Sequence, residues 1–143
     1  MGSVSEVADR QAVNGAIDTL LRSYPEDVQI LVRAARKKLR EWLPNVDEGV
    51  DASARMVAYR CGPGYKGMVC TLILSKLGVK LGLVGGAALA DPRGLLAGSG
   101  KAHRHIQLRT VRDLQQAGLK QLVLGASAAC RKRLDQPLTR AAS

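Results

Sequence analysis

The first third of the chain has apolar residues at helical spacing. In residues 7–23 they recur every three or four positions, and a second series follows directly after Pro25. Proline suits the first position of a helix, and the acidic residues at 26 and 27 would face the positive end of its dipole. The second series ends at Pro44 and forms one stripe of Val28, Leu31, Val32, Ala35, Leu39, Trp42 and Leu43. The pattern predicts two amphipathic helices.

From Ser53 the apolar positions alternate instead, which is typical of strands with one buried face. We expect four strands, at residues 55–60, 68–74, 79–84 and 103–109. These short runs are separated by glycine-rich or polar segments that favour turns. The alternation therefore predicts an antiparallel sheet that follows the two helices.

A last helical region is expected after Thr110, a residue that suits an N-cap. It would pass a weak point at Gly118 and end near Leu134, with residues 135–143 as a frayed tail. Its inner stripe would be Leu119, Leu122, Val123, Ala126 and Cys130. Residues 1–143 are thus predicted to form a single α+β domain, with two N-terminal helices, an antiparallel sheet of four to five strands and a C-terminal helix.

Alternation also predicts which side chains share a face of the sheet. The inward set is Val79, Leu81, Leu83, Ile106 and Leu108. Lys80, His103 and His105 lie on the opposite face, which we expect to be polar and basic. Arg104 has the inward phase, and a buried arginine needs a partner because an unpaired buried charge is costly. We therefore expect Asp91 to pair with Arg104 and to close the loop between them.

The net charge of +10 is unevenly distributed. Residues 1–51 hold nine acidic and seven basic residues, whereas residues 52–143 hold three acidic and fifteen basic residues, a net +12. Such a field attracts phosphate-bearing metabolites, nucleic acid or acidic proteins, although a solubility surface with a basic tail explains the same numbers. The polar face of the second helix carries Arg33, Arg36, Lys37, Lys38 and Arg40, either for nucleic acid or an anionic surface or simply for solvent.

Composition limits the core and the compartment. The chain has no Phe and a single Trp, so the core must be aliphatic. Its three cysteines lack any C-x-x-C spacing, which argues against a disulfide framework or a zinc cluster and fits a reducing cytoplasm. The N-terminus lacks the order of a signal peptide, and the most apolar stretch, residues 81–90, is about half the length that a membrane crossing needs. We expect a cytoplasmic protein with no membrane segment.

Residues 91–106 form the most distinctive segment. They hold a proline, three glycines, two histidines and four charged residues, with Asp91 at one end and Lys101 and Arg104 toward the other, more charge than a simple connection between strands requires. A phosphate-binding loop is excluded, because Leu95 stands where that motif needs Gly and Ala102 stands where it needs Ser or Thr. Two interpretations stay open: residues 98–100 form a looser backbone nest for an anion, or they form a glycine-rich turn.

The chain offers no recognisable catalytic set. No Ser or Cys has His and acid partners at the spacing of a triad, and the last two-thirds lack paired carboxylates. His103 and His105 would share a strand face, but no third ligand stands at a suitable spacing, so we expect no metal and no cofactor. Tyr59 and Tyr65 flank a turn, with Lys66 beside them, either as the wall of a pocket or as packing for that turn.

Several motifs occur in order from Tyr59 onward: Gly64-Tyr65-Lys66-Gly67-Met68, Val79-Lys80-Leu81-Gly82, Gly86-Ala87-Ala88-Leu89-Ala90-Asp91-Pro92, Gly94-Leu95-Leu96-Ala97-Gly98-Ser99-Gly100-Lys101 and Arg104-His105-Ile106. On these motifs, which span about half of it, the chain resembles the YdhG-like domain family, small bacterial domains mostly of unknown function. The resemblance implies an antiparallel sheet flanked by helices. One member of that family is described as a frataxin-like intracellular iron chaperone.

Two classes of function follow. The first is a non-catalytic binding domain for a small anionic ligand or an acidic protein partner, with a weak nucleic-acid contact as a sub-case. Its site would consist of Tyr65, Lys66, Lys80, Asp91, Gly98, Gly100, Lys101, Arg104 and His105. The alternative is a frataxin-like iron or metal chaperone that uses acids of the first two helices or the two histidines. The sequence makes no prediction about the oligomeric state.

Overall fold

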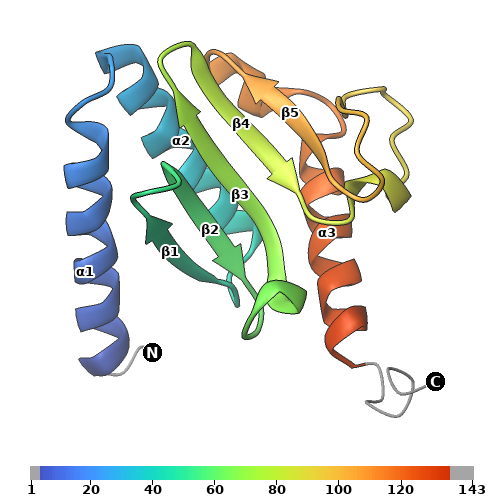
Figure 1. The fold of residues 1–143 in the computed structure, drawn as a ribbon, viewed down its shortest axis with the longest axis horizontal. Helices are drawn as coiled ribbons and strands as arrows, with labels where there is room; N and C mark the ends of the chain where they lie inside the picture. Colours follow the sequence, from blue (N-terminus) through green and yellow to red (C-terminus); the bar gives the residue numbers. More distant parts are fainter. Residues whose placement is uncertain (1–3, 136–143) are drawn as a thin grey trace.

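The computed structural model describes residues 4–135, and side chains from residue 10 onward. Two N-terminal helices lead into a five-stranded antiparallel sheet whose strand order follows the chain, and a third helix follows the sheet (Figure 1). The helices are α1 (Val4–Leu21), α2 (Glu26–Trp42) and α3 (Leu119–Leu134). The strands are β1 (Asp47–Asp51), β2 (Met56–Arg60), β3 (Met68–Ser75), β4 (Gly78–Leu83) and β5 (Arg104–Leu108). This is the α+β architecture that the sequence predicts.

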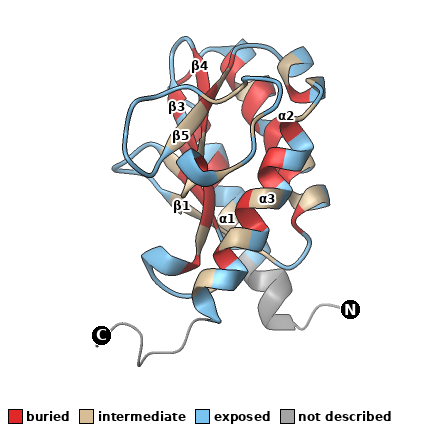
Figure 2. Cartoon of the chain, turned by 90° about the vertical axis from the view of Figure 1, so that its right-hand side faces the viewer, coloured by how far each residue is buried: buried red, intermediate tan, exposed pale blue. Residues whose placement is uncertain are grey.

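Three short 3₁₀ helices complete the described elements: η1 (Tyr65–Gly67), η2 (Gly86–Ala88) and η3 (Val111–Gln115). The helices α1, α2 and α3 lie on one face of the sheet, and buried residues fill the space between the two layers (Figure 2). Cross-strand pairing aligns the inward residues into rows, for example Val50, Val57, Leu72, Leu81 and Ile106. The predicted inward phase of β4 and β5 is confirmed.

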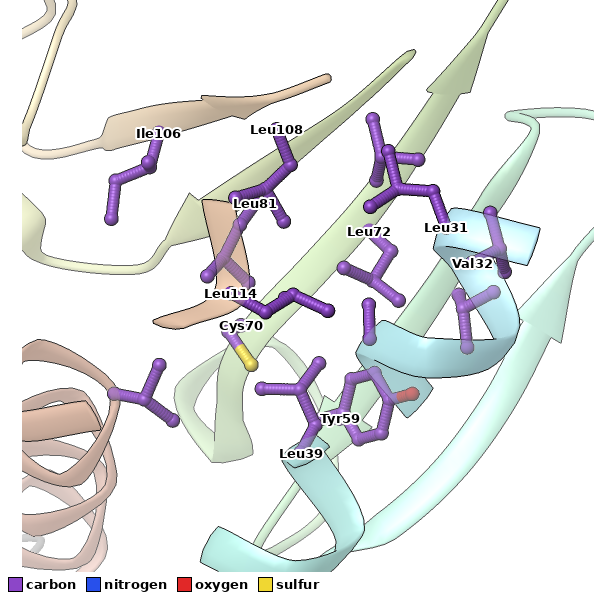
Figure 3. Close-up of a cluster of buried hydrophobic side chains, with 14 of the residues drawn as sticks. Leu31, Val32, Leu39, Tyr59, Cys70, Leu72, Leu81, Ile106, Leu108 and Leu114 are labelled. Carbon is purple, nitrogen blue, oxygen red and sulfur yellow. The ribbon is translucent and has the colours of Figure 1, made fainter. Parts of the chain in front are cut away.

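The core is aliphatic, as the composition predicts. Leu31 and Leu39 of α2 point toward the sheet, where Cys70 and Leu72 of β3 meet them (Figure 3). All five residues of the predicted inner stripe of α3 are buried. Two tyrosines are the exceptions, Tyr24 and Tyr59, and Tyr59 has only 1% of its surface exposed. Its polar hydroxyl therefore needs a partner inside the protein.

Two features on the N-terminal side of the sheet differ from the prediction. Pro25 is the N-cap of α2 and not its first residue. Strand β1 was not predicted at all, because its sequence Asp-Glu-Gly-Val-Asp has little strand preference. It forms because it pairs along its whole length with β2. The predicted tail starts at Asp135, which follows α3, but residues 136–143 lie outside the described part.

The C-terminal helical region is divided in two. The carboxylate of Asp113 accepts hydrogen bonds from the amides of Arg109 (2.7 Å) and Thr110 (3.0 Å), which fixes the start of η3. Gly118 has a φ of 92°, in the left-handed region where a glycine costs least, and α3 begins immediately after it. The predicted weak point is therefore a complete break between η3 and α3.

The prediction that Arg36 lies on a solvated face of α2 is wrong. Its side chain is only 10% exposed, and its guanidinium binds Glu48 of β1 through Nε (2.8 Å) and Nη2 (2.7 Å). Nη2 also donates to Asn14 Oδ1 of α1 at 2.9 Å, and Tyr59 Oη of β2 donates to Glu48 Oε2 at 2.6 Å. We call these four residues the buried polar network. It ties α1, α2, β1 and β2 together.

Candidate functional site

The connection between β4 and β5, residues 84–103, folds back on itself. It begins with Gly85 in the left-handed conformation (φ 73°) and passes through η2. Its two ends are joined by a hydrogen bond from the Ala87 amide to the Ala102 carbonyl at 2.9 Å. Ala97 exchanges two further backbone hydrogen bonds with His105 of β5, at 2.8 and 3.0 Å. The glycine-rich part of this connection is therefore held against the start of the edge strand.

Asp91 and Arg104 do not form the predicted ion pair. Both carboxylate oxygens of Asp91 accept backbone hydrogen bonds within the connection, from the amides of Leu95 and Leu96 at 2.9 Å each. Short acidic side chains compete well for nearby backbone amides, so the local partners satisfy Asp91 before a distant arginine can. The role of Asp91 is to shape the turn that follows it.

Arg104 closes the loop in another way. Its Cβ lies on the inward side of the sheet, as predicted. It packs so closely on Gly86 that a Cβ atom on Gly86 would come within 2.8 Å of it. The guanidinium, however, turns back to the loop, where Nη1 donates to the carbonyls of Gly100 and His103. Because Arg104 is the first residue of an edge strand and is only half-buried, its charge can reach solvent and needs no carboxylate.

The turn between β2 and β3 lies beside this loop. The hydroxyl of Tyr65 contacts Nε2 of His103, and the two rings meet edge to face with centroids 5.7 Å apart. The Lys66 carbonyl accepts a bond from Nε of Arg133, and the Met68 carbonyl accepts one from Nη2 at 3.0 Å. The turn, the loop and the last turn of α3 thus converge at one end of the sheet.

We call this convergence the basic junction. It consists of Tyr65, Lys66, Lys101, His103, Arg104 and Arg133. A side-chain atom built on Gly85 would lie 3.5 Å from Nη1 of Arg133, so η2 adjoins the junction as well. The ion pairs of the described side chains all lie elsewhere, and they join Arg33 to Asp18, Arg36 to Glu48 and Lys38 to Glu41. The positive charge of the junction is therefore not neutralised by a neighbouring carboxylate within the described part.

The structure brings together only part of the predicted site. Gly98 has a φ of 116° and packs on the ring of His105, which stands on the outer face of β5. Lys80 is exposed on the same outer face and pairs with Gln107. Asp91 instead lines a separate hollow of about 500 Å³ against the start of α3. The outer face itself is mixed and not uniformly basic, because Ala58, Thr71, Ile73 and Gly82 also belong to it.

Two further predictions about this region need correction. His103 lies before β5, so it does not share a strand face with His105 as expected. Tyr59 and Tyr65 do not act as a pair around the turn, because Tyr59 is buried against Glu48 while Tyr65 is 61% exposed. Arg133 is the functional candidate that sequence reasoning missed. It stands 67 residues after Lys66, and only folding brings the two together.

The described residues show little that would bind a metal ion. Among the side chains described, those of residues 10–135, no group of three or more His, Cys, Asp or Glu stands within reach of one ion. The helices of the same part of the chain lack the combined length and apolar composition of a membrane crossing. The arrangement at the basic junction offers hydrogen-bond donors and positive charge, which is the chemistry that recognises anions.

Comparison with known proteins gives no match: no family model, no curated protein and no solved structure is significantly similar to this chain. The resemblance to the YdhG-like family therefore stays a prediction.

Proposed function

We propose that this protein is a non-catalytic binding domain for a small anionic ligand or an acidic partner, and that the basic junction is its binding surface. The observation that carries the proposal is that η1, the loop and the last turn of α3 meet here and carry four basic residues with no carboxylate paired to them in the described part: Lys66, Lys101, Arg104 and Arg133. Uncompensated positive charge at one end of a domain concentrates anions there.

The backbone of the glycine-rich loop adds hydrogen-bond donors. Ala97 and His105 satisfy each other, but the amides of residues 98–101 donate to no protein acceptor within the described part. These amides stand beside Lys101, which is exposed. Backbone N–H groups without a protein acceptor, next to an exposed lysine, are suited to phosphate or carboxylate oxygens. The site residues that support this function best are therefore Gly98, Gly100, Lys101 and Arg104.

A titration with inorganic phosphate, followed by ¹H–¹⁵N NMR, tests the proposal residue by residue. We expect the amide signals of residues 98–101 to shift in a saturable way. Lys101→Ala should weaken this binding about 10-fold, because a charge-assisted contact contributes about 1.5 kcal/mol or more. It should leave the free energy of unfolding unchanged, since an exposed lysine contributes little to folding. Lys120→Ala, on the exposed side of α3, removes the same charge and is the matched control.

Two outcomes would contradict the proposal. One is the absence of saturable shifts in residues 98–101 at millimolar phosphate. The other is an equal loss of affinity in the Lys101→Ala and Lys120→Ala variants, which would mean that net charge alone attracts the anion. Retention on heparin that disappears at moderate salt would identify the weak nucleic-acid contact. The iron-chaperone alternative stays a prediction from the resemblance, and the described residues offer no specific support for it.

A further inference from the structure

A second basic region lies far from the junction in the sequence, along α2. Four bases of this helix, at positions 33, 36, 37 and 40, are each three or four residues from at least one other, so they lie toward one side of it. With Arg10 of α1 and the connection that follows α2, they surround a hollow of about 520 Å³. Its basic lining consists of Arg10, Arg33, Arg36, Lys37 and Arg40, and its apolar lining of Leu43, Pro44 and Val46. We call it the α2 hollow.

Arg36 gives this hollow a fixed donor. The buried polar network uses Nε and Nη2 of its guanidinium, which bind Glu48 and Asn14. The remaining nitrogen, Nη1, has no acceptor among the described residues, although the side chain is nine-tenths buried and lines the hollow. A guanidinium that Glu48 already holds in place loses little freedom when it binds a ligand. A preorganised arginine of this kind suits a planar or tetrahedral oxyanion.

The charges around Arg36 favour the same ligand. Arg33 is partly neutralised by Asp18, at 2.9 Å. Lys37 and Arg40 belong to no ion pair within the described part. Glu41 is the one acidic residue of the lining, and its Oε2 lies 4.0 Å from Nζ of Lys38, which partly neutralises it. The hollow therefore keeps a net positive charge after its internal pairs are counted.

We propose that the α2 hollow binds the phosphate group of a small phosphomonoester. Arg36, Lys37 and Arg40 would donate to the phosphate oxygens, and the organic part would lie on Leu43, Pro44 and Val46. The volume suits a small molecule, whereas a nucleic-acid strand would call for an extended groove. This site is independent of the basic junction, since the two share no residue.

The experiment is an NMR titration of the full chain with phenyl phosphate, and with inorganic phosphate for comparison. We expect saturable shifts in the amides of residues 33–46 and tighter binding of phenyl phosphate, because its ring adds apolar contact. Lys37→Gln should weaken binding at these residues about 10-fold, the effect of losing one charge-assisted hydrogen bond. Lys120→Gln removes the same charge from the exposed side of α3, outside the lining, and should leave the affinity unchanged. Lys101→Ala should also have no effect at these residues.

Three results would overturn this assignment. The first is an equal loss of affinity in the Lys37→Gln and Lys120→Gln variants. The second is the absence of a saturable shift in residues 33–46 with either phosphate at millimolar concentration. The third is a single-stranded oligonucleotide that binds these residues while phenyl phosphate does not. The first result would point to general charge attraction, and the last would point to a nucleic-acid surface.

Discussion

Replacing Glu48 with Ala tests the buried polar network directly. The change would leave the Arg36 guanidinium nine-tenths buried without its counter-charge and would remove the acceptor of Tyr59 Oη. Breaking a buried pair by removing one partner costs about 3–5 kcal/mol, because the remaining charge is uncompensated. We expect the free energy of unfolding to fall by about that amount. A triple variant, Arg36→Leu and Glu48→Leu with Tyr59→Phe, should recover much of it, since these three apolar residues need no partner.

The pH dependence of stability gives a second measure of the same network. Burial alone would raise the pKa of Glu48, but hydrogen bonds from Arg36 and Tyr59 and the nearby positive charge lower it below the ordinary value of 4.5. A carboxyl whose pKa is lower in the folded state stabilises the protein above its unfolded pKa. That stability is lost as the pH falls below about 4.5 and through the folded pKa. We therefore expect Glu48→Gln to flatten the acid side of the stability curve.

Urea unfolding followed by the fluorescence of Trp42, the single tryptophan, measures both effects at pH 7 and at a series of lower pH values. Trp42 packs against the core near the end of α2, so its signal reports the layer that the network joins. A loss of less than about 0.5 kcal/mol in Glu48→Ala at pH 7 would refute the reasoning, because that is the usual range for a surface substitution. An unchanged pH profile in Glu48→Gln would refute the assignment of the acid-sensitive stability to this carboxylate.

Three further predictions concern other parts of the chain. Arg104→Ala should lower the free energy of unfolding by only about 1 kcal/mol, measured by heat or urea, because Arg104 bonds loop carbonyls at a half-exposed position. A loss above about 3 kcal/mol would contradict this and favour a buried ion pair. Gly67→Ala should strongly destabilise the fold in the same assays, because its methyl group would overlap the backbone carbonyl of Gly62 and the two backbone segments cannot easily move apart. A variant as stable as the wild type would contradict this geometry. Burial raises the pKa of the Cys70 thiol to about 12. Alkylation at pH 8, measured by mass spectrometry, should therefore label the half-exposed Cys61 first and Cys70 only after unfolding. Equal labelling of the two cysteines in the native protein would argue against this burial.

Helices and inward strand faces could be predicted because each has a clear period in the sequence. The stripe of α2 and the alternation of β4 need no knowledge of distant residues. Strand β1 could not be predicted, since its acidic sequence has no strand preference and its place depends on β2 and on Arg36. Arg36 itself follows the polar phase of α2, and only the presence of Glu48 makes its burial favourable.

The candidate site was predictable as a segment but not as a set of contacts. The proline and the glycines of residues 91–106 predict a turn that leads back into a strand, and β5 does begin within this segment, at Arg104. The predicted ion pair between Asp91 and Arg104 was wrong for two reasons. The phase of a strand gives the direction of the Arg104 Cβ but not the course of the long side chain beyond it. The carboxylate of Asp91 has two backbone amides to bind within its own turn, so it does not need a distant charge. Arg133 carries no local signal of a site, since it resembles any basic residue at a helix end.

The order of the strands has a consequence for how the molecule assembles. From β1 to β4 each strand pairs with the next one along the chain through a short turn, so these pairings close small loops at little entropic cost. Strand β5 pairs with β4 only after residues 84–103 have been brought back, so among the strand pairings it has the largest loop-closure cost, and it lies at an edge of the sheet. The amides of β5 should therefore exchange with solvent faster than those of β3. An anion bound at the basic junction would connect β5 to the turn before β3 and slow the exchange of the β5 amides. Anion binding and the pairing of β5 would then be thermodynamically coupled.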